Sequence, residues 1–271
     1  MNKYRYWIIP AIFFGIICVL NLVGCLMLRM DLVRITKPAL MPLLCLASMT
    51  YLLPRLQTAG VGSPEAEGSG TTADGKSKTA EGSCTAADSK GVAADGNSTD
   101  VRGAGLLLAA QLIGFAGDTM LMGHGVIFLG AGMLLFMIGH IFYICLFGSL
   151  SFRGLKPWQT VLGLAVCLAA TAGLAFAVGA NGVLLAPMLI YGMVLMMLIF
   201  STFAGLLRFR GGTWALLLCG ALLFTFSDSL IAVRHFGTLS PFWDAFGVMS
   251  TYLLAQTLLA IGSIKLILNK I

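Results

Sequence analysis

Charged residues are scarce in this chain: they make up 10% of its 271 residues, against 58% for hydrophobic residues. Average soluble proteins carry about 25% charged residues, so the composition excludes an ordinary aqueous domain. Glutamate is the rarest of the charged residues, and all three glutamates, Glu65, Glu67 and Glu81, fall within one polar segment. The rest of the chain has the composition of a polytopic membrane protein.

Motifs for disulfide scaffolds, metal centres and secretion are missing as well. The seven cysteines are odd in number and show no Cys-x-x-Cys spacing, which favours buried free thiols. Asp, His and Tyr at scattered positions define no metal ligand set, so we expect neither a metal nor a cofactor. The first apolar run, Trp7 to Leu28, lacks a small-x-small cleavage site and is too long for a signal-peptide core, so we expect it to remain as a membrane span.

Long apolar runs predict an all-α fold, a polytopic membrane helix bundle. A span needs roughly 17 to 25 mostly apolar residues, and the whole chain, 1–271, is expected to form a single transmembrane domain. We predict about eight transmembrane helices, at 6–28, 38–53, 105–122, 126–148, 157–178, 184–206, 213–233 and 245–268.

The distribution of basic residues predicts the orientation. With eight spans, 13 of the 17 Lys and Arg residues fall on the side of the termini and 4 on the other side, which places both termini in the cytoplasm. In a bacterium the membrane would be the plasma (inner) membrane. The basic charge is then explained by orientation and contact with membrane lipid, so nucleic acid is not an expected partner.

Residues 55–104 differ from the remainder. Gly, Ser, Thr, Ala and Asp dominate this segment, and such a composition cannot bury enough apolar surface to offset the entropy of ordering. We expect a disordered, low-complexity cytoplasmic loop inserted between spans two and three, without chemistry of its own.

Two aspartates lie inside apolar runs, in matching local sequences. Asp118 follows Gly117 and precedes Thr119, and Asp228 lies between Ser227 and Ser229. A carboxylate in hydrocarbon is costly unless it faces a polar interior, so the pair predicts a buried polar site. Spans three and seven run in the same direction and carry their aspartates near the same end. This pattern is compatible with two parallel four-helix halves, each carrying one of the aspartates.

Other polar residues in or beside the spans are candidates for substrate contacts or for packing, and the sequence leaves both roles open. Lys37 and Pro38 are expected to open the second span, where Lys37 could meet a lipid phosphate. The candidates for substrate binding are Asn21, Lys37, His140, Tyr143, Tyr191, Arg234, His235, Tyr252 and Gln256.

Five short strings carry a family resemblance. They are Thr36-Lys37-Pro38, Gly117-Asp118-Thr119-Met120-Leu121-Met122, Gly139-His140-Ile141-Phe142-Tyr143, Phe226-Ser227-Asp228-Ser229-Leu230 and Tyr252-Leu253-Leu254-Ala255-Gln256. By the identity, order and spans of these strings, the chain resembles the lysoplasmalogenase family, the YhhN-like membrane proteins, over its whole length except 55–104.

The resemblance implies eight spans and a hydrolase that acts on ether bonds. Its substrate would be a lysophospholipid, lysoplasmalogen, whose vinyl ether bond is cleaved to a fatty aldehyde and glycerophosphoethanolamine or glycerophosphocholine. Two carboxyl groups suit this chemistry, because one can protonate the alkene while the other stabilises the oxocarbenium ion and activates water. We therefore assign Asp118 and Asp228 as catalytic, without deciding which is the acid.

Two other classes also use membrane aspartates. A proton-coupled transporter or a lipid-binding membrane protein could employ the same acidic pair. An intramembrane aspartyl protease is disfavoured, because Asp118 lacks the Gly-x-Gly-Asp form and Asp228 follows Ser227.

Overall fold

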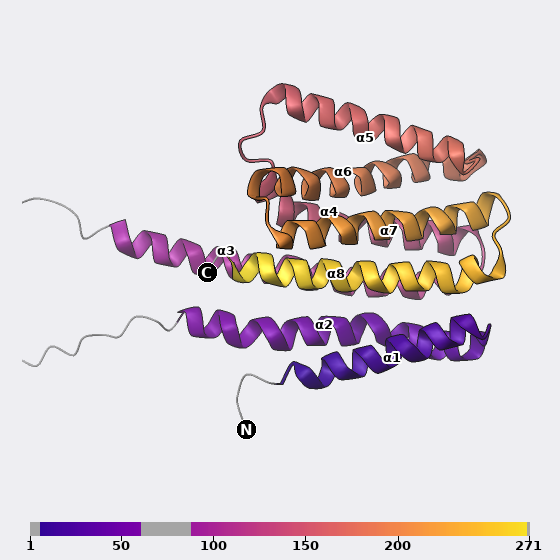
Figure 1. The fold of residues 1–271 in the computed structure, drawn as a ribbon, viewed down its shortest axis with the longest axis horizontal. Coiled ribbons are helices and arrows are strands. Elements are labelled where there is room, and N and C mark those ends of the chain that lie inside the picture. Colours follow the sequence, from indigo (N-terminus) through magenta and orange to yellow (C-terminus); the bar gives the residue numbers. More distant parts are fainter. Residues whose placement is uncertain (1–5, 61–87, 270–271) are drawn as a thin grey trace, which may run out of the picture.

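The computed structural model describes residues 6–60 and 88–269. Within these residues the chain forms helices and turns without a strand (Figure 1). The long helices are α1 (Ile8–Leu26), α2 (Met30–Gly60), α3 (Asp88–Leu121), α4 (Val126–Ser151), α5 (Pro157–Ala177), α6 (Leu185–Phe209), α7 (Gly212–Phe236) and α8 (Val248–Leu268). A 3₁₀ turn, Gly182–Leu184, precedes α6, and a π turn, Trp243–Gly247, precedes α8.

The prediction of eight membrane helices is confirmed: the described residues contain 8 helices that are long and apolar enough to cross a membrane. Backbone N–H and C=O groups have no water to bond in a bilayer, so an apolar segment of this length satisfies them internally as a helix. The predicted limits of the first span and of spans four to eight agree with the helices to within three residues at each end.

The second span differs from its prediction. Helix α2 begins at Met30, not at residue 38, and it contains Pro38, Pro42 and Pro54 in its interior. Lys37 therefore does not open a helix but lies two turns inside one. The charged residues at the start of α2 interrupt its apolar run, so the run alone did not indicate the first turns of the helix. The prolines are tolerated because neighbouring helices and side chains can satisfy the carbonyl groups that a proline leaves unbonded.

The helices also take in both ends of the segment predicted as a loop. Helix α2 continues to Gly60 and α3 starts at Asp88, so the predicted limits of 55 and 104 are wrong. The disorder predicted for the middle of the segment, residues 61–87, lies outside the described residues.

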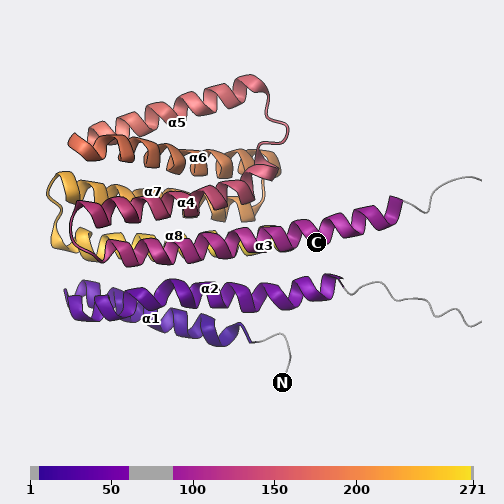
Figure 2. The ribbon, with the colours of Figure 1, turned by 180° about the vertical axis from the view of Figure 1, so that it is seen from behind.

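Consecutive helices pack as antiparallel neighbours within α1 to α4 and within α5 to α8, whereas α4 and α5 are not packed against each other (Figures 1 and 2). Helix α4 also packs against α6, and α8 contacts both α3 and α2. Helix α5 lies at one side of the bundle, where it packs mainly against α6, and α1 lies at the opposite side on α2. The pairing of α1 to α4 is thus repeated by α5 to α8. A symmetry axis between these halves stays a prediction.

Small residues allow the closest helix contacts. A Cβ atom on Gly220 of α7 would lie 3.2 Å from the carbonyl oxygen of Ala255 and 3.1 Å from the amide nitrogen of Leu259, both in α8. A side chain at this position would force the two backbones apart, which is why small residues recur at membrane helix interfaces. The tight α7–α8 contact helps to set the position of Asp228, two turns further along α7.

Candidate active site

Asp118 is buried near the end of α3 and receives two groups from other helices. The hydroxyl of Tyr252 in α8 donates a hydrogen bond to Oδ2 of Asp118, with a separation of 2.5 Å. The ammonium of Lys37 in α2 lies 3.9 Å from Oδ1. A buried carboxylate requires such a partner to offset lost hydration, so Lys37 supplies the opposite charge.

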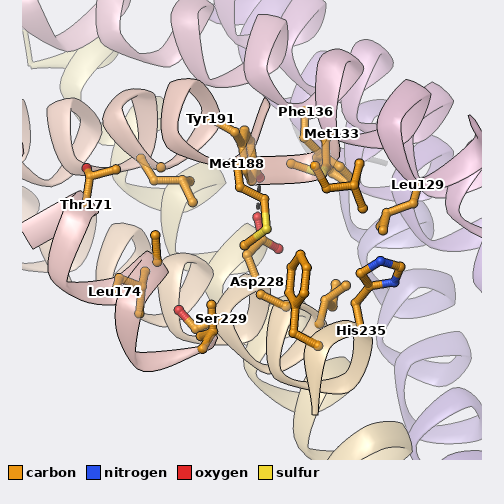
Figure 3. Close-up of a pocket in the computed structure, with 18 of the residues that line it drawn as sticks. Leu129, Met133, Phe136, Thr171, Leu174, Met188, Tyr191, Asp228, Ser229 and His235 are labelled. Atoms are coloured by element: carbon orange, nitrogen blue, oxygen red, sulfur yellow. Dashed lines mark hydrogen bonds between the residues drawn. The ribbon is translucent and has the colours of Figure 1, made fainter. Parts of the chain in front are cut away.

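Asp228 in α7 has a similar tyrosine partner but a different setting. The hydroxyl of Tyr191 in α6 donates a hydrogen bond to Oδ2 of Asp228, as the dashed line in Figure 3 shows. Asp228 is half-buried, whereas Asp118 is buried, and within the described residues the ion pairs include none to Asp228. Each carboxyl group therefore accepts a hydrogen bond from its own tyrosine, but only Asp118 also has a cation beside it.

The residue before each aspartate lies against the following helix. A Cβ atom on Gly117 would meet the Phe136 ring of α4 at 3.1 Å, so the glycine makes room for that ring. Ser227 donates a hydrogen bond to the carbonyl oxygen of Val248 in α8, at 3.0 Å. These contacts explain why the residues preceding the two aspartates are small.

Aromatic rings join the two carboxyl groups into one site. The rings of Phe136 and Phe224 have centroids 5.8 Å apart, and each contacts the Tyr252 ring, at 6.2 and 5.6 Å respectively. Asp118 and Asp228 are close enough for the charge of one to act on the other. The predicted convergence of the two aspartates thus appears in the tertiary structure as one cluster of acidic and aromatic residues.

His140 of α4 also lies in this cluster. Its ring centroid is 4.3 Å from that of Phe224 and 6.1 Å from that of Tyr191. Nδ1 of His140 lies 2.6 Å from the carbonyl oxygen of Phe136. Because a carbonyl oxygen can only accept, the proton is on Nδ1, and Nε2 of a neutral ring is left as an acceptor.

An apolar cavity opens beside Asp228 (Figure 3). The side chains of Asp228, Tyr191 and Ser229 contribute polar atoms to its wall, and His235 lies at the same wall further along α7. The remaining lining is mostly aliphatic and aromatic and comes from α3 to α7: Leu121, Leu129, Met133, Phe136, Thr171, Leu174, Ala175, Val178, Leu184, Met188, Gly192, Leu195, Ile231, Ala232 and Phe236. Such a lining suits an alkyl chain with its reactive end at Asp228.

The other candidates from the sequence divide into two groups. Gln256 is buried one helical turn after Tyr252 on the same face of α8, so it belongs to the Asp118 side of the cluster. Arg234 is exposed and pairs with Asp244 at 3.1 Å. Asn21 does not line the cavity: its amide nitrogen donates to Oγ1 of Thr36 at 2.8 Å and joins α1 to α2.

Tyr143 is buried one turn beyond His140 and stacks on Phe147, with centroids 5.8 Å apart. Its hydroxyl has no hydrogen-bond partner among the described residues, and it does not line the cavity. The residues that sequence reasoning missed are Phe136, Phe224 and Met188. Phe136 is four residues before His140, so helical spacing was the one signal that could have placed it on the site face.

Comparison with known proteins identifies the family of this chain. The model of the YhhN family matches residues 91–263, a range that contains both aspartates and both of their tyrosine partners. No solved structure matches the chain. Within the described residues, no group of three or more His, Cys, Asp or Glu side chains is arranged to hold a metal ion.

Proposed function

This chain belongs to the YhhN family, and we propose that it is a membrane-embedded hydrolase of the lysoplasmalogenase type. It would cleave the vinyl ether bond of lysoplasmalogen, releasing a fatty aldehyde and glycerophosphoethanolamine or glycerophosphocholine. The observation that carries this proposal is a pair of interacting carboxyl groups, each hydrogen-bonded by a tyrosine, of which one borders an apolar cavity. The resemblance of the sequence motifs to lysoplasmalogenases supplies the substrate class.

The different surroundings of the carboxyl groups suggest different roles. Asp118 is paired with the Lys37 ammonium, so we assign it the ionised role, in which it stabilises positive charge. Asp228 borders the cavity and has a tyrosine rather than a cation as its partner, so we assign it the role of general acid. A carboxyl group near a second carboxylate favours sharing one proton between them.

The reaction would proceed in three balanced steps. Asp228 transfers its proton to the alkene carbon remote from the ether oxygen, which leaves an oxocarbenium ion and an Asp228 carboxylate. Water adds to the cationic carbon as the Asp118 carboxylate takes up one of its protons, giving a hemiacetal. In the collapse, Asp118 returns this proton to the leaving glycerol oxygen while the Asp228 carboxylate takes the proton of the hemiacetal hydroxyl. The aldehyde and the glycerol hydroxyl are released, and both carboxyl groups are restored for the next cycle.

The cavity suits the two ends of such a substrate. Its aliphatic lining would hold the alkenyl chain by van der Waals contact, since within a bilayer the chain already has an apolar environment. His235 lies at the cavity wall and is exposed, so it is the best-placed of the predicted residues to contact the substrate phosphate. Lys37 is less available for that contact because it lies beside Asp118.

The direct test is aldehyde release by the purified full-length protein in lipid nanodiscs. We expect aldehyde from lysoplasmalogen and none from a lysophospholipid with an ester-linked acyl chain, because only the vinyl ether forms an oxocarbenium ion on protonation. The Asp228→Asn variant serves as the matched control. A folded parent that releases no aldehyde would reject the hydrolase proposal and favour a proton-coupled transporter or a lipid-binding protein.

A further inference from the structure

A second cavity lies between α5 and α6, at the end of the bundle opposite to the aspartates. It has a volume of about 720 Å³ and is bordered by residues of α5, α6 and the turn between α4 and α5. Figure 1 shows α5 diverging from α6 toward this turn. The cavity shares no lining residue with the one beside Asp228, so its occupant does not compete for the candidate active site.

Two arginines from different segments line this cavity. Arg153 lies in the turn after α4, and Arg208 lies in the last turn of α6. The Arg208 guanidinium lies against the turn, since a Cβ atom on Gly154 would be 3.0 Å from its Nη1. Within the described chain, neither arginine pairs with a carboxylate. Two positive charges on one cavity repel each other, and an anion between them would remove that cost.

The start of α5 adds to this positive potential. Pro157 is the first residue of the helix, so the positive end of the α5 dipole lies at the same turn as Arg153, although the amides of Gln159 and Thr160 already donate to the carbonyl oxygen of Lys156. A helix N-terminus carries a partial positive charge of roughly half a unit and favours phosphate. The exposed Lys156 immediately before the helix contributes a further cation.

The remainder of the cavity is apolar and runs along the membrane-spanning parts of both helices. Leu162 and Val166 of α5 and Phe200 and Phe203 of α6 line it. Trp158, also in the lining, is 60% exposed at a position where aromatic residues mark the membrane–water interface. A soluble anion would leave this apolar wall unused, whereas an acyl chain would cover it.

We propose that this cavity, the α5–α6 groove, binds one anionic phospholipid. Arg153 and Arg208 hold the phosphate, and one acyl chain lies along Leu162, Val166 and Phe203. A zwitterionic headgroup fits less well because its ammonium would approach two arginines and Lys156. The basic-residue distribution predicts that this end faces the cytoplasm, where the leaflet is rich in anionic lipid. The proposal does not depend on the hydrolase activity.

Native mass spectrometry of the full-length protein tests this preference. After exchange into detergent with equal amounts of phosphatidylglycerol and phosphatidylcholine, we expect one phosphatidylglycerol to be retained in at least about tenfold excess over phosphatidylcholine. The double variant Arg153→Gln/Arg208→Gln should lose this excess, because each interfacial arginine contributes severalfold to binding an anionic lipid. The matched control is Arg102→Gln, which removes an exposed cation of α3 that does not line the groove.

A third variant separates the acyl chain from the phosphate. Ala170→Phe fills the inner end of the groove and leaves both arginines in place, so we expect it to lower phosphatidylglycerol retention as well. Thermal unfolding with soluble glycerol phosphate should show no stabilisation comparable to that by phosphatidylglycerol. Equal retention of the two lipids by the parent, an unchanged excess in the double variant, or equal stabilisation by glycerol phosphate would each overturn the proposal.

Discussion

The Tyr252 hydroxyl and the Asp118 carboxylate, 134 residues apart in sequence, form a hydrogen bond of 2.5 Å between α8 and α3. Tyr191 forms the corresponding bond to Asp228 between α6 and α7. In each case the tyrosine comes from outside the helix that carries the aspartate. The two bonds join four helices around the candidate site.

The two aspartates should act as a unit. We expect Asp118→Asn and Asp228→Asn each to lower aldehyde release from lysoplasmalogen by on the order of 10²-fold or more, since an amide can neither donate an acidic proton nor stabilise an oxocarbenium ion by charge. The double variant should be little worse than the poorer single one. Asp228→Asn should unfold at or above the parental temperature, because asparagine is cheaper to bury and Asp228 has no cation partner among the described residues. A well-folded single variant with parental turnover would end this mechanism.

The Tyr252 bond should contribute to both stability and turnover. We expect Tyr252→Phe to lower the free energy of unfolding by about 1 kcal/mol, because Asp118 loses a buried donor, and to lower kcat for lysoplasmalogen. Tyr143→Phe is the matched comparison for stability. Its hydroxyl has no partner among the described residues, so its loss should cost nothing. Equal destabilisation by the two changes would show that the Tyr252 bond is unimportant.

Lys37 should matter through Asp118. We expect Lys37→Met to lower turnover by about tenfold or more and to destabilise the fold, because it leaves a buried carboxylate without its cation. In the background of Asp118→Asn the same change should have much less effect on stability, since there is no charge left to balance. A double-mutant cycle measured by thermal unfolding checks this coupling. Additive effects would mean that the 3.9 Å contact carries no energy.

Only the middle of the polar segment, residues 61–87, should be dispensable for folding and activity, and not the whole of 55–104. We expect replacement of 61–87 by a Gly/Ser linker of equal length to leave folding and aldehyde release nearly unchanged. Replacement of 55–104 should destabilise the protein, because Leu56 and Ala104 are buried in the core. Size-exclusion profiles and unfolding temperatures of the two variants distinguish these outcomes. Loss of folded protein in the shorter replacement would contradict the first expectation.

The basic-residue asymmetry predicts cytoplasmic termini and a non-cytoplasmic turn between α3 and α4. A cysteine at position 124, which lies in that turn and is exposed, should react with an impermeant thiol reagent from the non-cytoplasmic side. A cysteine at position 156, which is exposed in the α4–α5 turn, is the control for the opposite side. Labelling at 124 from the cytoplasmic side alone would reverse the orientation and the assigned leaflet of the α5–α6 groove.

Some elements of this protein were accessible from sequence because they depend on local composition. An apolar segment of about twenty residues satisfies its own backbone groups as a helix, so both ends of α5 were predicted to within one residue and those of α4 to within three. Helix α2 was not, because its first turns carry Asp31, Arg34 and Lys37 and resemble a polar connection. The cost of an isolated carboxylate in hydrocarbon likewise singled out Asp118 and Asp228 before any partner was known.

The sequence by itself determined the helical membrane class, the acidic pair and the family motifs, whereas tertiary structure alone decided which side chains meet. Lys37 with Asp118, Tyr191 with Asp228, and His140 against Phe224 depend on how each helix is rotated about its axis and how closely neighbours approach. Those quantities are set by interhelical packing, such as the close contact at Gly220, and hydropathy along one segment does not report them. The α5–α6 groove likewise results from how α5 and α6 diverge near Arg153, and no sequence motif predicted it.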